Sequence, residues 1–414
     1  MKLKRIIIVL LLSILSVSAF SVGTVQAKSK WSKKVFYDKK QKIEYVLSNN
    51  GKEAGIVRCK SKKKKIIIPD YLGGKKVTTI GVDDYAIFTN ASNIEEIIFP
   101  DTVTSFRYFC FGATGKLKKV KLSKNLVKIP AGAFEFCTSL KKIELPDKIK
   151  EISNSAFYGC RSLKEVTFSS ACTKIGSDAF RECGNLSKIN LKKIKKVGNR
   201  AFLGCTKLSE IQLMNVREIG IEAFKRTGVK KVTLGKKTIV GEGCFAQCYN
   251  LDSFVGNKKN DLVYKNGVFL NGKGDKLLYG AKTSDTLNIP EGVRTICCKA
   301  FRSNKKIKEI NAPDTLEIIE DNAFMYCPVL EKVEAPGLRE IGEEAFCECR
   351  SLKSISISAV ERVGAYAFYE CNSLSELIFS DMLQEINQGA LKGIENLKTV
   401  YFPPSAKISS KVYG

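Results

Sequence analysis

The chain has 414 residues, a formal net charge of +27 and no histidine. The lack of histidine excludes Ser-His and Cys-His nucleophile pairs and histidine general bases, so the sequence favours a protein that is not an enzyme. The positive charge favours anionic partners.

The basic residues are concentrated in the N-terminal portion. Residues 291–414 hold 15 lysines and arginines against 18 acidic residues, a net charge of −3, which leaves +30 for residues 1–290. This charge fits an anionic cell-wall polymer, anionic lipid or acidic glycans. An alternative is that the lysines only keep an extracellular rod soluble.

Residues 1–27 have the pattern of a secretory signal peptide. A basic start, residues 2–5, precedes an apolar run over residues 6–20, and Val25-Gln26-Ala27 resembles a cleavage site. The alternative is an uncleaved membrane anchor, but the run is shorter than the ~20 residues that span a bilayer. We therefore expect a secreted, extracellular or cell-wall-associated protein with no transmembrane segment in the mature chain. Secretion also argues against a specific nucleic-acid partner.

Residues 28–65 are predicted to form a basic β-hairpin that caps the repeats after it. Two apolar runs, residues 42–47 and 54–59, flank the turn sequence Asn49-Asn50-Gly51. Five lysines follow in residues 60–65. They are interpreted as a solvated loop, with anion binding as the alternative.

Residues 66–251 and 287–402 are built from one repeat of 21–23 residues. A constant period predicts a solenoid, in which each coil buries its apolar face against the next. Segments such as Lys142–Leu145 predict short parallel strands, and Ala156–Cys160 predicts one helical or 3₁₀ turn. The pattern is found from an Ala-Phe slot that recurs about thirteen times, at Phe88, Phe111, Phe134, Phe157, Phe180, Phe202, Phe224, Phe245, Phe301, Phe324, Phe346, Phe368 and, as leucine, Leu391.

Residues 252–286 interrupt the period, because 56 residues separate Phe245 from Phe301. Asn266-Gly267 between two apolar runs predicts a β-hairpin that leaves the solenoid. Its role is either local elaboration or a contact for a partner at the rim. Residues 403–414 are predicted to form a C-terminal tail.

The repeat, seen clearly in Ile175–Leu191, Val197–Leu213 and Ile341–Ile357, resembles the BspA-like leucine-rich repeat of bacterial secreted and surface proteins. The resemblance covers about residues 66–402. It implies secreted or cell-surface proteins, some of them adhesins for host matrix proteins, and offers no catalytic residues. The fold we expect is a leucine-rich-repeat solenoid of about 13 coils, with a parallel β-sheet on its concave face.

The outward positions of these strands form the candidate binding surface. The basic members of its columns are Lys118, Lys119, Lys121, Lys142, Lys188 and Lys231. The main hypothesis is an adhesin-like protein that recognises a host or bacterial surface protein or glycan through the concave face of the solenoid. The alternative is a structural protein retained on the anionic cell wall by its basic portion, and an enzyme is a remote third hypothesis.

The fifteen cysteines are interpreted mainly as free, buried thiols. Eight occupy one repeat position, where a thiol acts as a small apolar group: Cys137, Cys160, Cys183, Cys205, Cys248, Cys327, Cys349 and Cys371. Neighbouring coils bring Cα atoms to ~4.8 Å, within the disulfide range, but parallel side chains give poor bridging geometry. No cofactor or metal site is predicted, because Cys297-Cys298 and Cys347-x-Cys349 lack the paired Cys-x-x-Cys spacing of zinc sites.

Overall fold

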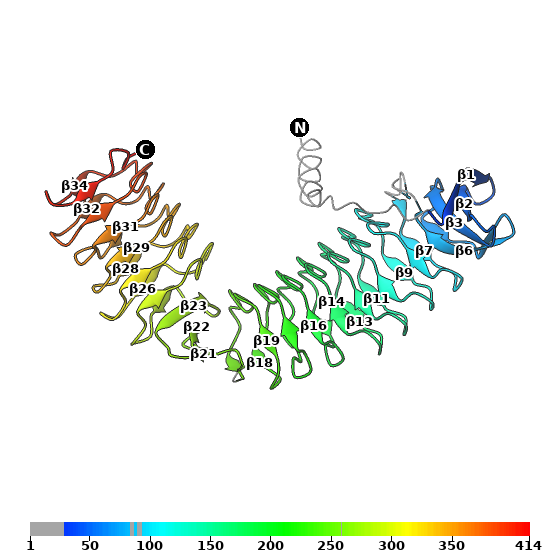
Figure 1. Ribbon diagram of the computed structural model, residues 1–414, viewed down its shortest axis with the longest axis horizontal. Coiled ribbons are helices and arrows are strands. Elements are labelled where there is room, and N and C mark those ends of the chain that lie inside the picture. Colours follow the sequence, from blue (N-terminus) through cyan, green and yellow to red (C-terminus); the bar gives the residue numbers. More distant parts are fainter. Residues whose placement is uncertain (1–28, 83–86, 89–92, 258) are drawn as a thin grey trace.

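The structure is a computed structural model that describes residues 29–82, 87–88, 93–257 and 259–414. Over these residues the chain forms a β-solenoid of about fifteen turns whose coils follow an arc (Figure 1). The predicted solenoid is therefore confirmed. The signal peptide predicted for residues 1–27 lies outside the described residues. In the described part, no helix has the length and apolar character to cross a membrane.

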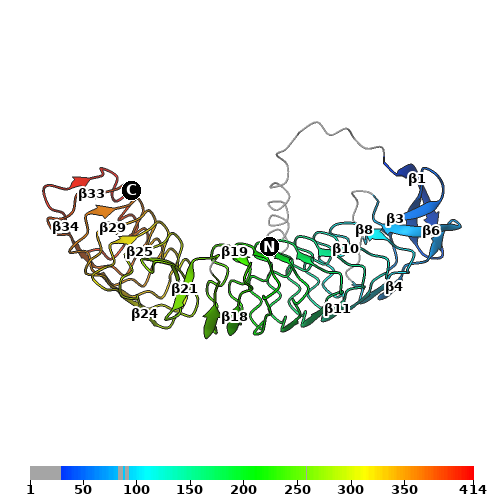
Figure 2. The same ribbon diagram turned by 60° about the horizontal axis from the view of Figure 1, so that its bottom comes forward.

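The first strand of each coil contributes to a surface that we call the long-strand face. Figure 2 shows its strands along one edge of the solenoid. In the N-terminal part they are β4 (Lys65–Ile67), β7 (Glu96–Ile98), β9 (Lys119–Lys121), β11 (Lys142–Glu144), β13 (Glu165–Thr167), β15 (Lys188–Ile189), β18 (Lys231–Thr233) and β20 (Ser253–Val255). In the C-terminal part they are β24 (Thr286–Asn288), β26 (Glu309–Asn311), β28 (Lys332–Glu334), β30 (Ser354–Ile355), β32 (Glu376–Ile378) and β34 (Thr399–Tyr401).

The second strand of each coil has two residues, and these strands form the short-strand face. The N-terminal set is β8 (Ser105–Phe106), β10 (Lys128–Ile129), β12 (Glu151–Ile152), β14 (Lys174–Ile175), β16 (Lys196–Val197), β17 (Glu218–Ile219) and β19 (Ile239–Val240). The C-terminal set is β25 (Thr295–Ile296), β27 (Ile318–Ile319), β29 (Glu340–Ile341), β31 (Arg362–Val363), β33 (Glu385–Ile386) and β35 (Lys407–Ile408).

Within each sheet, successive strands of a face pair in parallel and in the register of the repeat. Lys142 pairs with Glu165, and Glu165 pairs with Lys188. Residues at one repeat position therefore form columns along the solenoid, as the period predicts. The long-strand face is divided into several sheets, with breaks between β9 and β11, β15 and β18, β20 and β24, and β30 and β32. At the break between β15 and β18, the intervening coil makes only one bridge, from Leu213 to Leu234.

The Ala-Phe segments form a stack of turns instead of the predicted helical or 3₁₀ turns, and the described residues contain no α-helix. The Cys160 N–H donates to the Phe157 carbonyl of its own coil (3.2 Å), whereas the Phe157 N–H donates to Ala179 of the next coil (2.8 Å). A helix would keep both bonds within one segment. Ser155 has a φ of 54°, which breaks any helical run and directs N–H groups toward the neighbouring coil.

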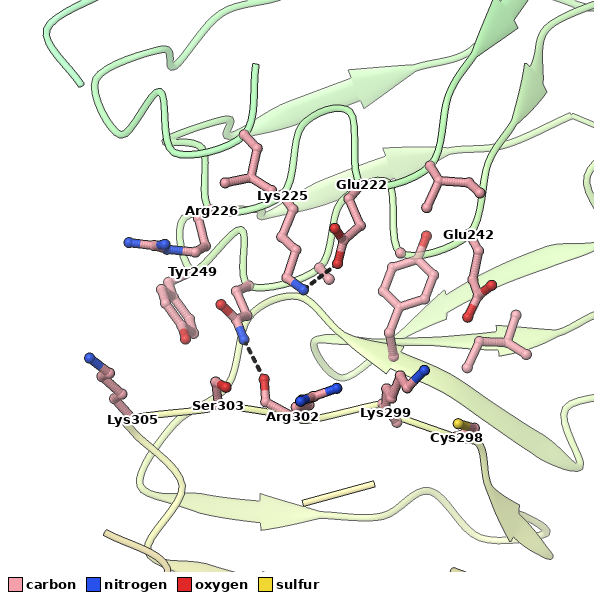
Figure 3. Close-up of a pocket in the computed structure, with 18 of the residues that line it drawn as sticks. Glu222, Lys225, Arg226, Glu242, Tyr249, Cys298, Lys299, Arg302, Ser303 and Lys305 are labelled. Carbon is pink, nitrogen blue, oxygen red and sulfur yellow. Dashed lines mark hydrogen bonds and ion pairs between the residues drawn. The ribbon is translucent and has the colours of Figure 1, made fainter. Parts of the chain in front are cut away.

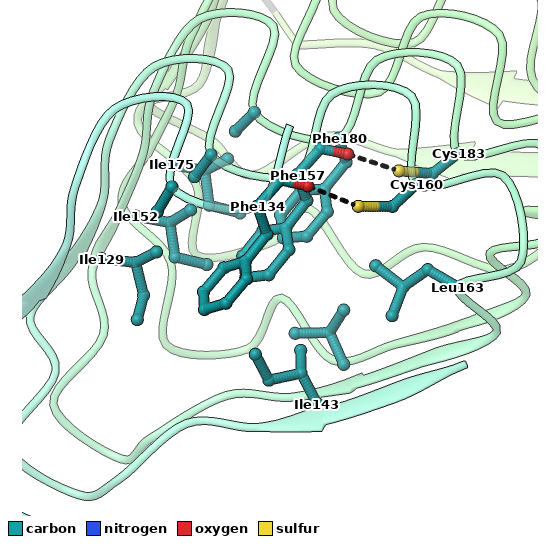
Figure 4. Close-up of a cluster of buried hydrophobic side chains, with 14 of the residues drawn as sticks. Ile129, Phe134, Ile143, Ile152, Phe157, Cys160, Leu163, Ile175, Phe180 and Cys183 are labelled. Atoms are coloured by element: carbon teal, nitrogen blue, oxygen red, sulfur yellow. Dashed lines mark hydrogen bonds between the residues drawn. The ribbon is translucent and has the colours of Figure 1, made fainter. Parts of the chain in front are cut away.

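A column of phenylalanine rings fills the interior (Figure 4). Phe157 and Phe180 are fully buried, with ring centroids 5.2 Å apart and planes at 2°. The Cys183 thiol donates to the Phe157 carbonyl at 3.1 Å, and all fifteen cysteines are free. At Gly198 an added Cβ would lie 2.5 Å from the Ser177 backbone nitrogen, so glycine at this repeat position allows the coils to approach closely.

The cap at the N-terminus has the predicted hairpin and one strand more. The hairpin is antiparallel, with Gly51 at a φ of 67° in its turn, and the sheet continues in parallel into the first coil. The cap strands are β1 (Trp31–Asp38), β2 (Ile43–Ser48) and β3 (Glu53–Cys59), and the strands of the first coil that continue the sheet are β5 (Tyr71–Leu72) and β6 (Lys75–Ile80).

The inserted hairpin does not leave the solenoid but forms a turn of it. Its strands are β21 (Leu262–Lys265), β22 (Val268–Asn271) and β23 (Lys276–Gly280). Asn266 and Gly267 have φ values of 49° and 84°, as an Asn-Gly hairpin turn requires. Phe269 is fully buried 6.3 Å from the Phe245 ring, and β23 pairs in parallel with β25. The hairpin thus connects the two runs of coils.

Residues 403–414 form most of a further coil, and the tail predicted there is not seen. β35 pairs with β33, and Val412 is buried, with its carbonyl accepting a bond from the Leu391 N–H (3.0 Å). Val412 occupies the slot that alanine fills elsewhere, because its N–H donates to the Ser409 carbonyl as the Ala156 N–H donates to that of Ser153. The Ala-Phe count missed this coil because valine does not match the pattern.

Candidate binding surfaces

The six lysines predicted as binding residues are all exposed on or beside the long-strand face. Lys118 precedes β9, and the other five lie in strands of this face: Lys119 and Lys121 in β9, Lys142 in β11, Lys188 in β15 and Lys231 in β18. Figure 1 shows that these strands extend over a large part of the N-terminal arc. The structure therefore arranges the lysines in a row and does not gather them into one pocket.

Acidic side chains interrupt this row. Lys118 pairs with Glu95 at 2.7 Å, and this hydrogen bond lowers the pKa of the Glu95 carboxyl. Lys142 pairs with Glu144 at 3.0 Å. The other four lysines form no ion pair with a described residue. Exposed ion pairs stabilise a fold only weakly, so Lys118 and Lys142 can exchange their partners for a ligand.

A hollow of about 410 Å³ lies on the long-strand face at the discontinuity between β15 and β18. Lys231 lines one side of it, and Met214, 60% exposed, lines another. The hollow exists because residues 211–213 form a single bridge and no regular strand. Of the predicted residues, Lys231 is thus the one with a concave neighbourhood.

A larger cleft of about 980 Å³ lies where the inserted hairpin joins the two runs of coils (Figure 3). Its N-terminal wall comes from the turn stack of the coils that carry Phe224 and Phe245. Its C-terminal wall comes from residues 298–306. The hairpin supplies strands between these coils but no outer turn of the usual length, so the turn stack has a break there.

Two buried side chains form the floor of this cleft. The Gln247 amide nitrogen donates to the Arg302 carbonyl at 3.1 Å, and the Gln247 N–H donates to the Gly280 carbonyl at 2.8 Å. Tyr279 is 5% exposed, and its hydroxyl has no hydrogen-bond partner of normal geometry among the described residues. Burial raises the pKa of Tyr279 well above its usual value, which keeps the hydroxyl protonated.

The cleft has seven basic side chains against two acidic ones, Glu222 and Glu242. Sequence reasoning found the interruption but missed this cleft, because its walls come from segments more than 45 residues apart. A signal was nevertheless present: residues 299–306 hold four basic residues and no acidic one, directly after the break.

The repeat and the architecture of this chain also occur in known proteins. A model of the BspA type leucine rich repeat region matches six copies, over residues 59–149, 128–252 and 274–398. The chain belongs to the BspA-type leucine-rich repeat family. No curated protein matches the sequence.

Solved structures of leucine-rich repeat proteins resemble this BspA-type chain along most of its length. A leucine rich cell surface protein from Faecalibacterium prausnitzii is 24% identical, with a TM-score of 0.61 over 92% of this chain and 96% of that one. A leucine-rich repeat protein from Bacteroides ovatus is 23% identical, with a TM-score of 0.53 over 89% and 88%. At this level of identity the similarity shows a shared fold.

Proposed function

We propose that the protein is a secreted or cell-surface binding protein, adhesin-like and without catalytic activity, that recognises a surface protein or glycan of a host or bacterium through its long-strand face. Membership of the BspA-type family supports this proposal, as does the similar structure that is described as a cell surface protein. The lack of histidine in the chain also favours binding over catalysis.

The observation that carries the proposal is the hollow beside Lys231. It combines an exposed methionine with a lysine that has no ion pair to a described residue, on a surface of regularly spaced columns. Exposed apolar groups rimmed by polar ones are typical of protein-interaction sites, and methionine adapts to irregular partners. Binding here would use contact area in addition to charge.

The test is a binding screen of the chain without residues 1–27 against extracellular matrix proteins, surface glycans and wall polymers. For any partner found, Met214→Ala combined with Lys231→Gln is expected to weaken binding by about tenfold or more. Met382→Ala with Lys398→Gln is the matched control, because Met382 is 49% exposed on a distant coil. Equal affinity of the two double variants would refute the assignment to this hollow.

A second function, retention on an anionic cell wall, is favoured by one observation. The net charge is +30 in residues 1–290 and −3 in residues 291–414, so one end of the solenoid is strongly basic. Such retention would depend on the summed field instead of one site. Retention by charge therefore predicts that binding falls steeply as the salt concentration rises and that any single substitution has little effect.

A further inference from the structure

We propose that the cleft beside the inserted hairpin binds the phosphate or sulfate groups of a linear polyanion. This site lies on the turn stack, away from the hollow at Lys231, and the proposal does not rest on the function proposed above.

The cations of the C-terminal wall have no acidic partners. Lys299, Arg302, Lys305 and Lys306 all line the cleft, and none of them forms an ion pair within the described part of the chain. Aromatic rings hold two of them: Lys306 lies 4.5 Å from the Tyr249 ring centre and Arg302 lies 5.7 Å from that of Tyr326. Cation–π contacts position a cation and leave its charge uncompensated.

The opposite wall adds one cation that is available to a ligand. Arg226 is 51% exposed, and its guanidinium lies 3.7 Å from a Glu182 oxygen, a loose contact. Lys225, in contrast, is tied to Glu222 by a short hydrogen bond. Figure 3 shows Arg226 and Tyr249 facing Ser303 and Lys305 at one end of the cleft, whereas Glu242 lies near Cys298 and Lys299 at the other end.

An anion at the Arg226 end would therefore have cations on two sides, and the carboxylate beside Arg226, that of Glu182, is in only loose contact with it. A phosphate or sulfate group suits this arrangement, because its several oxygens accept from both walls, and guanidinium groups bind such oxyanions in a bidentate manner. The volume, about 980 Å³, is at the upper limit for small-ligand sites and holds more than one phosphate or sulfate group, which favours a polymer.

The experiment measures binding of fluorescently labelled inorganic polyphosphate by fluorescence polarisation across a salt series. The variant is Lys305→Gln/Lys306→Gln. Its matched control is Lys236→Gln/Lys237→Gln, which removes the same charge from an exposed lysine pair outside the cleft. We expect the cleft variant to raise the Kd by about tenfold or more and to reduce the salt slope by roughly one for each lost contact, with a change below about threefold in the control.

Further variants separate a specific site from a change of net charge or of folding. Lys305→Arg/Lys306→Arg is expected to retain binding, and Arg302→Gln to weaken it. Met214→Ala/Lys231→Gln is expected to leave polyphosphate binding unchanged, so a failure of this proposal is distinguishable from a failure of the proposed function. Equal weakening in the cleft variant and its matched control would overturn the proposal.

Other polymers identify the anionic group. Binding of both dextran sulfate and polyphosphate, with the same sensitivity to Lys305→Gln/Lys306→Gln, would support a general oxyanion site, and binding of only one would assign the site to sulfate or to phosphate. Polyglutamate is expected to bind at least about tenfold more weakly, because carboxylates offer fewer oxygens to the two walls. Polyglutamate that binds equally well through the same lysines, or failure of both dextran sulfate and polyphosphate to bind, would contradict the proposal.

Discussion

The stability of each coil depends on a few residues that recur at fixed positions. The central phenylalanine stacks on those of both neighbouring coils, and the cysteine three residues later bonds to the carbonyl of the preceding phenylalanine. Because the same contacts repeat from coil to coil, loss of one residue disturbs two interfaces at once. Three predictions concern single residues.

Phe180→Ala should destabilise its part of the solenoid by about 3–5 kcal/mol, because the ring is fully buried between two others. Hydrogen exchange of the adjacent coils in increasing urea measures the effect. Tyr401→Ala is the control, since Tyr401 is 47% exposed and its loss should change stability by less than about 0.5 kcal/mol. Equal effects of the two substitutions would contradict the stacked core.

Glu135 gives a pH dependence of opposite sign to that of an ordinary paired carboxylate. Burial, together with the nearby Asp178 charge, raises the pKa of Glu135 from 4.5 to about 7. The unfolded chain therefore releases this proton first, and the contribution of Glu135 to stability falls as the pH rises from about 4.5 to about 7.

Glu135→Gln should remove this decline. The urea midpoint of the variant should therefore increase relative to that of the wild type as the pH rises from 5 to 8. Glu376→Gln, on an exposed position of β32, is the control and should show no such gain. Parallel pH curves for wild type and Glu135→Gln would show that Glu135 is not buried as described.

The thiols should differ sharply in reactivity. Thirteen cysteines are buried, whereas Cys297 and Cys298 are half-buried, and burial raises the pKa of most of these groups, for Cys172 to about 11. A thiol reagent at pH 8 should modify at most Cys297 and Cys298 in the folded protein and all fifteen in denaturant. Rapid modification of Cys160 or Cys183, located by mass spectrometry, would contradict the packed cysteine column.

At the scale of elements, sequence patterns predicted those structures that depend on neighbouring residues. Asn266-Gly267 identified the hairpin turn, and Asn50-Gly51 identified the cap turn. The turn stack was not predictable in the same way. Ser155 and Arg200 adopt a φ of 54°, which side chains rarely favour, and hydrogen bonds to the next coil, such as Ser155 N–H to the Ser177 carbonyl (2.8 Å), compensate. The position of β23 beside β25, and with it the cleft, also depends on residues distant in sequence.

The two turn glycines of the inserted hairpin, Gly267 and Gly274, should differ in how much their substitution destabilises the protein. Gly267 has a φ of 84°, and an added Cβ would lie 2.0 Å from the Lys282 carbonyl oxygen, so Gly267→Ala should destabilise by more than about 1 kcal/mol. Gly274, with a φ of 79° and open space around it, is the matched control and should lose less in Gly274→Ala. Thermal denaturation measures both variants. Equal losses would mean that the hairpin does not pack against the solenoid at Lys282.

At the scale of the whole molecule, about fifteen coils present long surfaces whose chemistry changes along the arc. The N-terminal coils are rich in lysine and the C-terminal coils are weakly acidic. Charge alone would attract many anionic partners, whereas the hollow beside Lys231 adds an apolar contact that charge does not supply. The two candidate functions thus differ in how binding responds to salt and to substitutions on the long-strand face.

The most direct measurement is the salt dependence of binding to the partner found in the screen, for wild type and Met214→Ala/Lys231→Gln. At 1 M salt the Debye length is ~3 Å, so attraction between exposed charges is largely screened. Recognition through the long-strand face predicts that wild-type binding persists at 1 M salt and that the double variant binds at least about tenfold more weakly at every salt concentration. Complete release of both proteins by salt, with equal affinities at low salt, would contradict recognition through this face.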